Sequence, residues 1–150
     1  MRAVVQRVLS ASVASSDDRY AAIASGLLVL LGIAPEDGDA EIGWMCRKIA
    51  GLRIFSDSAG KMNLSLKETG GELLVVSQFT LYGDVSRGNR PGFSGSASFD
   101  QALPIYNRFV QRMEEQLGKP VMTGWYGAEM KLSLLNDGPV TLIIDTPIST

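Results

Sequence analysis

The chain has 150 residues, of which 45% are hydrophobic and 20% charged, as is usual for a single soluble globular domain. Its formal net charge of −2 provides no general basic surface for wrapping nucleic acid, so any contact with RNA must be local. With no histidine and one cysteine, the chain can form neither an internal disulfide nor the usual zinc sites. Catalysis by a Ser-His-Asp or Cys-His group is excluded as well. We expect one domain over residues 1–150, with no metal and no cofactor.

The apolar segments indicate a protein that does not enter membranes. The N-terminal sequence MRAVVQRV is interrupted by Gln6 and Arg7, so it lacks the apolar centre of a secretory signal. The apolar run over residues 26–34 is less than half of the ~20 residues that a membrane helix needs. We therefore expect a cytoplasmic protein.

The first third of the chain predicts three strands. A valine-rich, loosely alternating pattern predicts a strand over residues 2–14, followed by a turn at Asp17-Asp18. Residues 19–24 and 26–34 predict a second and a third strand. The third is apolar on both faces, which is typical of a central strand.

A helix is predicted next, from a cap at Asp37 or Asp39 to about Gly51. Its apolar positions fall at helical spacing and predict one buried stripe: Ile42, Met45, Cys46 and Ile49. On this stripe Cys46 is interpreted as a small core residue rather than a nucleophile.

The rest of the chain predicts five more strands and a second helix. Residues 52–57 and 71–84 predict strands, and residues 84–98 form a loop long enough to suggest a function. The helix runs from near Asp100 to Leu117, ends at Gly118 and has the inward stripe Ala102, Tyr106, Phe109, Met113 and Leu117. The last strands are predicted over 121–127, 131–137 and 139–145.

This order of elements predicts one α/β domain. We expect the strands to pack as two sheets or as a barrel-like unit, with the two main helices on one side.

No standard catalytic apparatus is visible in the sequence. The acidic residues lie mostly at turns and helix starts, where capping explains them, and RGNRPGFSG matches neither phosphate-loop pattern. A Ser-Lys or Thr-Lys pair stays possible. Otherwise backbone groups must act, and the end of the apolar strand at residues 77–84 could direct free N–H groups at an oxyanion. The alternative is a plain strand leading into a turn.

The pair Gly138-Pro139 has an unusual position between two apolar runs. Proline cannot donate a hydrogen bond to a sheet, so a simple interpretation is a turn before a strand. If the bond is cis, however, the two carbonyl groups point the same way. Glycine would keep that polar edge free of a Cβ atom.

Two segments together resemble a known family. SQFTL at residues 77–81 and NDGPVT at residues 136–141 are similar to the paired signature motifs of the D-aminoacyl-tRNA deacylases, long called D-tyrosyl-tRNA deacylases. The resemblance covers essentially the whole chain and continues through GLLVLLGI, RIFSD and SRGNRPGFS. It implies a homodimer of three-layered α/β/β subunits that hydrolyses the ester between a D-amino acid and the terminal adenosine of tRNA.

The resemblance also implies roles for residues. Gly138 and Pro139, held by Arg7, would reach into the partner's active site and exclude L-amino acids. Gln78 and Phe79 would offer main-chain N–H groups to the reacting carbonyl, beside Ser77 and Thr80. Further supporting residues are Tyr126, Met130, Asn136 and Thr141. Contacts to tRNA phosphates are expected from Arg87 and Arg90, with Lys61 or Lys131 as helpers.

Such a filter acts by exclusion, so many D side chains should pass and glycine should be poorly excluded. The ribose 2′-hydroxyl could handle the proton. Three alternatives stay open: a Thr80 nucleophile, a catalytically silent homodimeric RNA-binding module and a binder of free D-amino acids. Trp125-Tyr126-Gly127 and Gly92 depart from the family's usual residues and affect the expected fine specificity.

Overall fold

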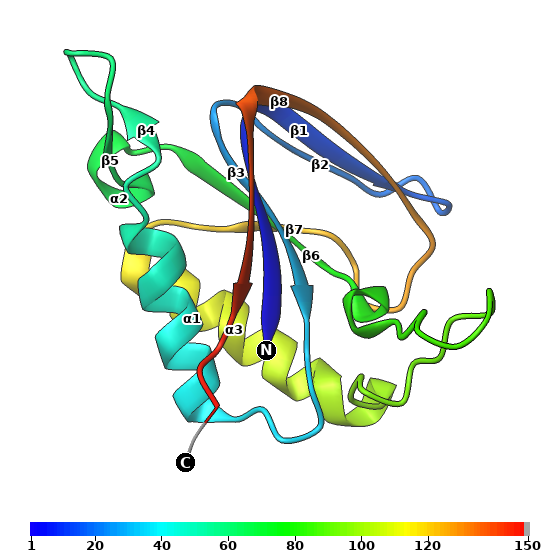
Figure 1. The fold of residues 1–150 in the computed structure, drawn as a ribbon. Coiled ribbons are helices and arrows are strands. Elements are labelled where there is room, and N and C mark those ends of the chain that lie inside the picture. Colours follow the sequence, from blue (N-terminus) through cyan, green and yellow to red (C-terminus); the bar gives the residue numbers. More distant parts are fainter. Residues whose placement is uncertain (149–150) are drawn as a thin grey trace.

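The computed structural model describes residues 1–148, which form an α/β unit (Figure 1). Its strands and helices have the following bounds: β1 (Arg2–Ser15), β2 (Tyr20–Ile23), β3 (Gly26–Gly32), α1 (Asp39–Gly51), β4 (Phe55–Ser56), β5 (Met62–Leu64), α2 (Leu66–Thr69), β6 (Glu72–Ser77), the 3₁₀ turn η1 (Phe79–Tyr82), α3 (Phe99–Leu117), β7 (Met122–Thr123) and β8 (Met130–Asp145).

A mixed sheet of six strands organises the fold. Its order is β2-β1-β3-β6-β7, and β8 pairs with the other side of β1. The long strand β1 is antiparallel to its neighbours, whereas β3, β6 and β7 run parallel. Strands β4 and β5 form a separate two-stranded sheet. The large sheet curls until it is nearly barrel-shaped, and α1 and α3 cover one side of it (Figure 1).

The central strands are apolar on both faces because each face meets a different core. Toward α1 and α3, one face contributes Leu27, Val29 and Leu31, which pack in a cluster with residues of both helices. On the opposite face, Leu28, Leu74 and Val76 pack against side chains of β1 and β2. The curled sheet therefore supplies both β layers of an α/β/β arrangement, and the predicted fold class is confirmed.

Both main helices are confirmed, with one correction at a cap. Cys46 is fully buried in α1, as expected for a core residue, and burial raises the pKa of its thiol to about 12. The N-cap of α1 is Gly38, whose N–H donates to the Glu41 carboxylate at 2.9 Å. Neither Asp37 nor Asp39 is the N-cap.

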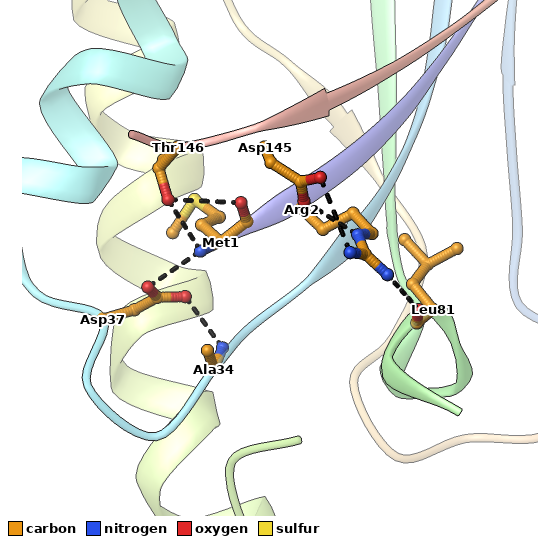
Figure 2. A network of polar contacts seen from close by, with 7 residues as sticks. All are labelled: Met1, Arg2, Ala34, Asp37, Leu81, Asp145 and Thr146. Atoms are coloured by element: carbon orange, nitrogen blue, oxygen red, sulfur yellow. Dashed lines mark hydrogen bonds and ion pairs between the residues drawn. The ribbon is translucent and has the colours of Figure 1, made fainter. Parts of the chain in front are cut away.

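Asp37 instead joins the N-terminus to the segment before α1. Its carboxylate accepts hydrogen bonds at 2.8 Å from the amino group of Met1 and from the Ala34 N–H (Figure 2). The same amino group donates to Thr146 Oγ1 at 2.9 Å. Since the side chain of Asp37 is 5% exposed, this ion pair is shielded from solvent, and loss of either partner would leave a buried charge uncompensated.

Several predicted strands have different bounds in the structure. The strand expected over 71–84 ends at Ser77, and that expected over 121–127 is reduced to Met122–Thr123. Residues 131–137 and 139–145 belong to one strand, β8, rather than to two. Both halves of β8 pair with β1, so a tertiary partner overrides the local break at Gly138-Pro139.

The region between α1 and β6 also differs from the prediction. Of the strand expected over 52–57, only Phe55–Ser56 is regular, and the sequence patterns missed β5 and the short helix α2. Within residues 1–148, no helix combines the length and apolar character needed to cross a bilayer.

Candidate active site

A cavity of about 530 Å³ opens where β3 and β6 end. This volume suits a small organic group, because ligand pockets typically measure about 300–1,000 Å³. Its wall brings together five residues singled out in the sequence: Ser77, Gln78, Phe79, Tyr126 and Met130. The other lining residues are mainly apolar and come from β3 and its end, β6, the start of α3 with the segment before it, the β7–β8 connection and β8: Leu31, Ile33, Val76, Ser96, Ala97, Phe99, Ala102, Gly127, Ala128 and Leu132.

Gln78, the first residue after β6, still contacts β3 through its backbone. The Gln78 N–H donates to the Leu31 carbonyl at 2.7 Å, after which η1 turns across the strand end. Gly32 permits this close approach, since a Cβ atom there would lie 3.2 Å from the Leu81 Cβ. The prediction that the Gln78 N–H is free for a substrate is therefore wrong.

The first two N–H groups of η1 differ from the N–H of Gln78, which is bonded to β3. Within residues 1–148, the N–H groups of Phe79 and Thr80 have no acceptor, as is normal at the start of a helical turn. The side-chain amide of Gln78 donates to the hydroxyl of Thr80. Two adjacent free donors at the edge of an apolar cavity can stabilise a negative oxygen without any titratable side chain.

Arg2 attaches η1 to the sheet from its other side. Its Nη1 donates to the Leu81 carbonyl at 3.0 Å, and its Nε donates to Asp145 Oδ1 at 2.8 Å (Figure 2). The guanidinium also lies 5.1 Å from the centre of the Tyr82 ring. The turn that carries the free N–H groups is thus connected to the first and last strands.

Aromatic rings form the wall of the cavity beside α3. The Tyr126 ring lies 4.9 Å from that of Phe99 and 5.5 Å from that of Tyr106, centre to centre, and partial burial raises the pKa of the Tyr126 hydroxyl. Gly127 has a φ of +80°, and a Cβ atom there would lie 2.6 Å from the Phe99 ring. Gly127, where the sequence departs from the usual residue of the resembled family, therefore makes room for the Phe99 ring. Sequence reasoning missed Phe99, whose large apolar side chain at an exposed helix start was the available signal.

Met130 closes the neighbouring part of the wall. Its sulfur accepts a hydrogen bond from the Trp125 N–H at 3.4 Å. A Cβ atom at Gly124 would lie 2.7 Å from the same sulfur, so a larger residue there would displace the thioether. The flexible thioether fills the space between β8 and the segment leading to Tyr126.

Gly138 and Pro139 lie in an irregular part of β8. The peptide bond between them is cis. The pairing with β1 shifts here, so residues 137–140 face Arg7 alone. Arg7 donates to the carbonyls of Asp137 at 2.9 Å and Ile54 at 2.6 Å, and forms an ion pair with the Asp137 carboxylate at 3.5 Å.

Asn136 stabilises the same bulge from within the strand. Its side-chain oxygen accepts from the Val140 N–H at 2.8 Å, and its amide donates to the Val140 carbonyl at 3.1 Å. The amide also reaches Thr141 Oγ1 at 3.3 Å. These contacts replace the ladder hydrogen bonds that the bulge interrupts, so Asn136, Thr141 and Arg7 together position the Gly-Pro unit.

Within one chain, the two signature segments lie apart. Gly138 and Pro139 do not line the cavity that contains Ser77 and Phe79. In Figure 1 the bend of β8 lies at one end of the sheet, whereas the green turn that follows β6 lies toward the other. A single copy therefore does not bring the expected filter to the expected catalytic turn.

The arginines of the long loop lie on a small hairpin. The Asp84 N–H donates to the Gly92 carbonyl at 2.7 Å, and the Gly92 N–H donates back at 2.9 Å. Arg87 and Arg90 are exposed between these two residues. Lys61 directly precedes β5 and Lys131 is in β8, so neither lysine belongs to this hairpin.

The described residues offer no ready metal site. Within residues 1–148, no group of three or more cysteine, aspartate or glutamate side chains is arranged to hold a metal ion. The cavity wall itself offers backbone donors, hydroxyl groups and aromatic rings.

Comparisons with known proteins match this arrangement over almost the full length. The family model described as D-Tyr-tRNA(Tyr) deacylase matches residues 4–145. A protein of Chlorobium limicola named D-aminoacyl-tRNA deacylase is 65% identical over 147 residues, covering 98% of both chains. A solved structure described as "c-Myc DNA Unwinding Element Binding Protein" is 40% identical with a TM-score of 0.92, covering 99% of this chain and 100% of its own. A structure of a probable eukaryotic D-amino acid tRNA deacylase, 18% identical with a TM-score of 0.85, shares the fold over 97% of this chain and 98% of its own.

Proposed function

The chain belongs to the D-Tyr-tRNA(Tyr) deacylase family, and from this premise we propose that it hydrolyses the ester bond of D-aminoacyl-tRNA. The products are the free D-amino acid and tRNA. The observation that carries the proposal is the pair of free N–H groups, at Phe79 and Thr80, beside an apolar cavity large enough for the terminal adenosine.

In the proposed reaction, water attacks the carbonyl carbon of the ester. The carbonyl oxygen becomes negative and accepts hydrogen bonds from the N–H groups of Phe79 and Thr80, each contributing roughly 2.7–4 kcal/mol to transition-state stabilisation. The bond to the ribose 3′-oxygen then breaks, and that oxygen takes up the proton that water loses, relayed by the neighbouring 2′-hydroxyl. This route suits a cavity whose described lining contains no histidine, lysine or carboxylate.

Gly138 and Pro139 act as the chirality filter in this proposal. They are supplied by the second subunit of a homodimer, since they lie outside the cavity of their own chain. Exposed apolar side chains along β1 and β8 support such pairing: Leu9, Leu134, Leu135 and Ile143, the last of which is 72% exposed. Large apolar side chains exposed on two paired strands are typical of a surface that another protein covers.

The filter predicts a specific order of substrates. Side-by-side deacylation of D-Tyr-tRNA, Gly-tRNA and L-Tyr-tRNA should show cleavage of the first two and a rate on the order of 100-fold lower for the third, the scale expected when reacting groups are held out of position. Equal rates for the D and L esters would contradict the filter. Binding without turnover of any ester would favour the silent RNA-binding module instead.

Replacing Thr80 with alanine separates the backbone mechanism from a threonine nucleophile. Alanine keeps the N–H at position 80 and removes only the hydroxyl, which in the structure contacts the neutral amide of Gln78 rather than a base. We expect kcat for D-Tyr-tRNA to fall by less than about tenfold, within the range of losing a side contact rather than a nucleophile. Loss of hydrolysis with unchanged tRNA binding would show that the hydroxyl attacks the ester.

A further inference from the structure

Two exposed aromatic side chains, one of them in the cavity wall and the other in contact with it, have rings with no role in the ester chemistry described above. Phe79 is 57% exposed and Phe93 is 40% exposed. Their ring centres are 5.2 Å apart with an angle of 65° between the planes, which is an edge-to-face pair. A ring that touches its neighbour by an edge leaves its own faces free for another aromatic group.

The position of Phe93 is set by backbone contacts. It directly follows Gly92, whose two hydrogen bonds with Asp84 close the base of the hairpin. A Cβ atom at Gly83 would lie 3.2 Å from the Phe93 ring, so glycine allows the ring to lie against the end of η1. Although solvent-exposed, the two rings are therefore held in a defined arrangement.

The same surface carries local positive charge. Arg87 and Arg90 are exposed on the hairpin that precedes Phe93, and Figure 1 shows this segment projecting from the body of the protein between η1 and α3. The acidic residue of the hairpin, Asp84, accepts a hydrogen bond from the Ser86 N–H at 2.9 Å. A chain with a net charge of −2 thus carries two exposed arginines on the hairpin that leads to one of two exposed rings, and arginines with exposed rings are the combination used to bind single-stranded nucleic acid.

We propose that Phe79 and Phe93 form a stacking platform for the base of the unpaired nucleotide that precedes the terminal adenosine, with Arg87 and Arg90 facing its phosphate. The inference rests on the proposed function, which puts the terminal adenosine in the cavity. Phe79 belongs both to the cavity wall and to the aromatic pair, so the base next to that adenosine would leave the cavity over the two rings. Stacking depends little on base identity, so this subsite would accept any tRNA acceptor end.

The test compares two small esters of the same D-amino acid. One is D-tyrosyl-adenosine, and the other is the D-tyrosyl ester of the dinucleotide cytidylyl-adenosine. The native protein should have a kcat/KM about tenfold higher for the dinucleotide ester, equivalent to roughly 1.4 kcal/mol and within the range for one stacked base. In Phe93→Leu this ratio should fall to about 1, whereas Phe93→Tyr should keep it because the ring remains.

The ratio is measured within each variant, so a general loss of folded protein lowers both rates and leaves it unchanged. Equal kcat/KM for the two esters in the native protein, or an unchanged ratio in Phe93→Leu, overturns the platform. If Phe93→Leu changes the oligomeric mass measured by sedimentation but keeps the kcat/KM ratio of the two esters, the rings belong to a protein–protein contact. That result also overturns the platform. Failure of the native protein to cleave even D-tyrosyl-adenosine would instead contradict the proposed function itself.

Discussion

Replacing Gly138 with alanine is expected to lower kcat/KM for D-Tyr-tRNA by about 100-fold and to narrow the preference for D over L esters. Gly138 has a φ of +139°, a conformation that L residues rarely adopt. An added Cβ atom would lie 2.8 Å from Val140 Cγ2 and 3.2 Å from Arg7 Nη2, so the Gly-Pro unit must move. A displacement of about 1 Å at a positioning group can cost 10²-fold in rate.

The matched control for this change is Gly51→Ala. A Cβ atom at Gly51 would have no neighbour within 4 Å, so this variant should keep both the rate and the D/L ratio. Circular dichroism and thermal unfolding of the two variants separate a displaced filter from a misfolded chain. If Gly138→Ala keeps the native rate and D/L ratio, the filter does not reside at this position.

Replacing Phe79 with proline should lower kcat about 100-fold relative to Phe79→Ala, because proline removes the N–H that alanine keeps. Position 79 is the first residue of η1, where proline is well tolerated, and the preceding Gln78, with φ −145° and ψ 84°, lies outside the helical region that a following proline disfavours. Both variants lose the aromatic ring, so their ratio isolates the backbone donor. Single-turnover kinetics with D-Tyr-tRNA measure it, and equal rates for the two variants would contradict an oxyanion role for this N–H.

Gly138→Ala and Phe79→Pro, used together, also test whether the site is shared between subunits. Gly138→Ala impairs the donated filter, whereas Phe79→Pro impairs the receiving turn. If each site combines both segments from different chains, half of the randomly re-paired dimers are mixed, and each mixed dimer has one intact site. Unfolding and refolding the two variants together should therefore restore about a quarter of native activity. No recovery in verified mixed dimers would place both segments of a working site on one chain.

Much of the site could be predicted because its residues lie in short, specific motifs. SQFTL and NDGPVT placed Ser77, Gln78 and Phe79 in one group and Gly138-Pro139 in another, and the structure puts the first group in the cavity wall. The wall opposite was harder to predict. Phe99 and Ala128 come from separate segments, and neither has a local pattern that indicates a shared cavity.

One error in the site has a clear physical cause. The N–H of Gln78 was expected to face the substrate because the family resemblance implies that role for Gln78 and Phe79. The parallel strand β3 extends far enough for the Leu31 carbonyl to accept this hydrogen bond at 2.7 Å. Strand length alone does not reveal how far a non-local neighbour continues, so the free donors move one residue along the chain, to Phe79 and Thr80.

The sequence by itself determined the two main helices and the family, and it narrowed the candidate chemistry. The lack of histidine excluded the common catalytic groups, helical spacing placed Cys46 in the core, and both signature motifs occur in order. Tertiary structure decided whatever depends on pairing between distant residues. Residues 131–145 became one strand because both halves pair with β1, and Asp37 met the amino group of Met1 instead of capping α1. Local patterns record burial and turn preference, whereas sheet register and buried ion pairs depend on which distant segment lies alongside.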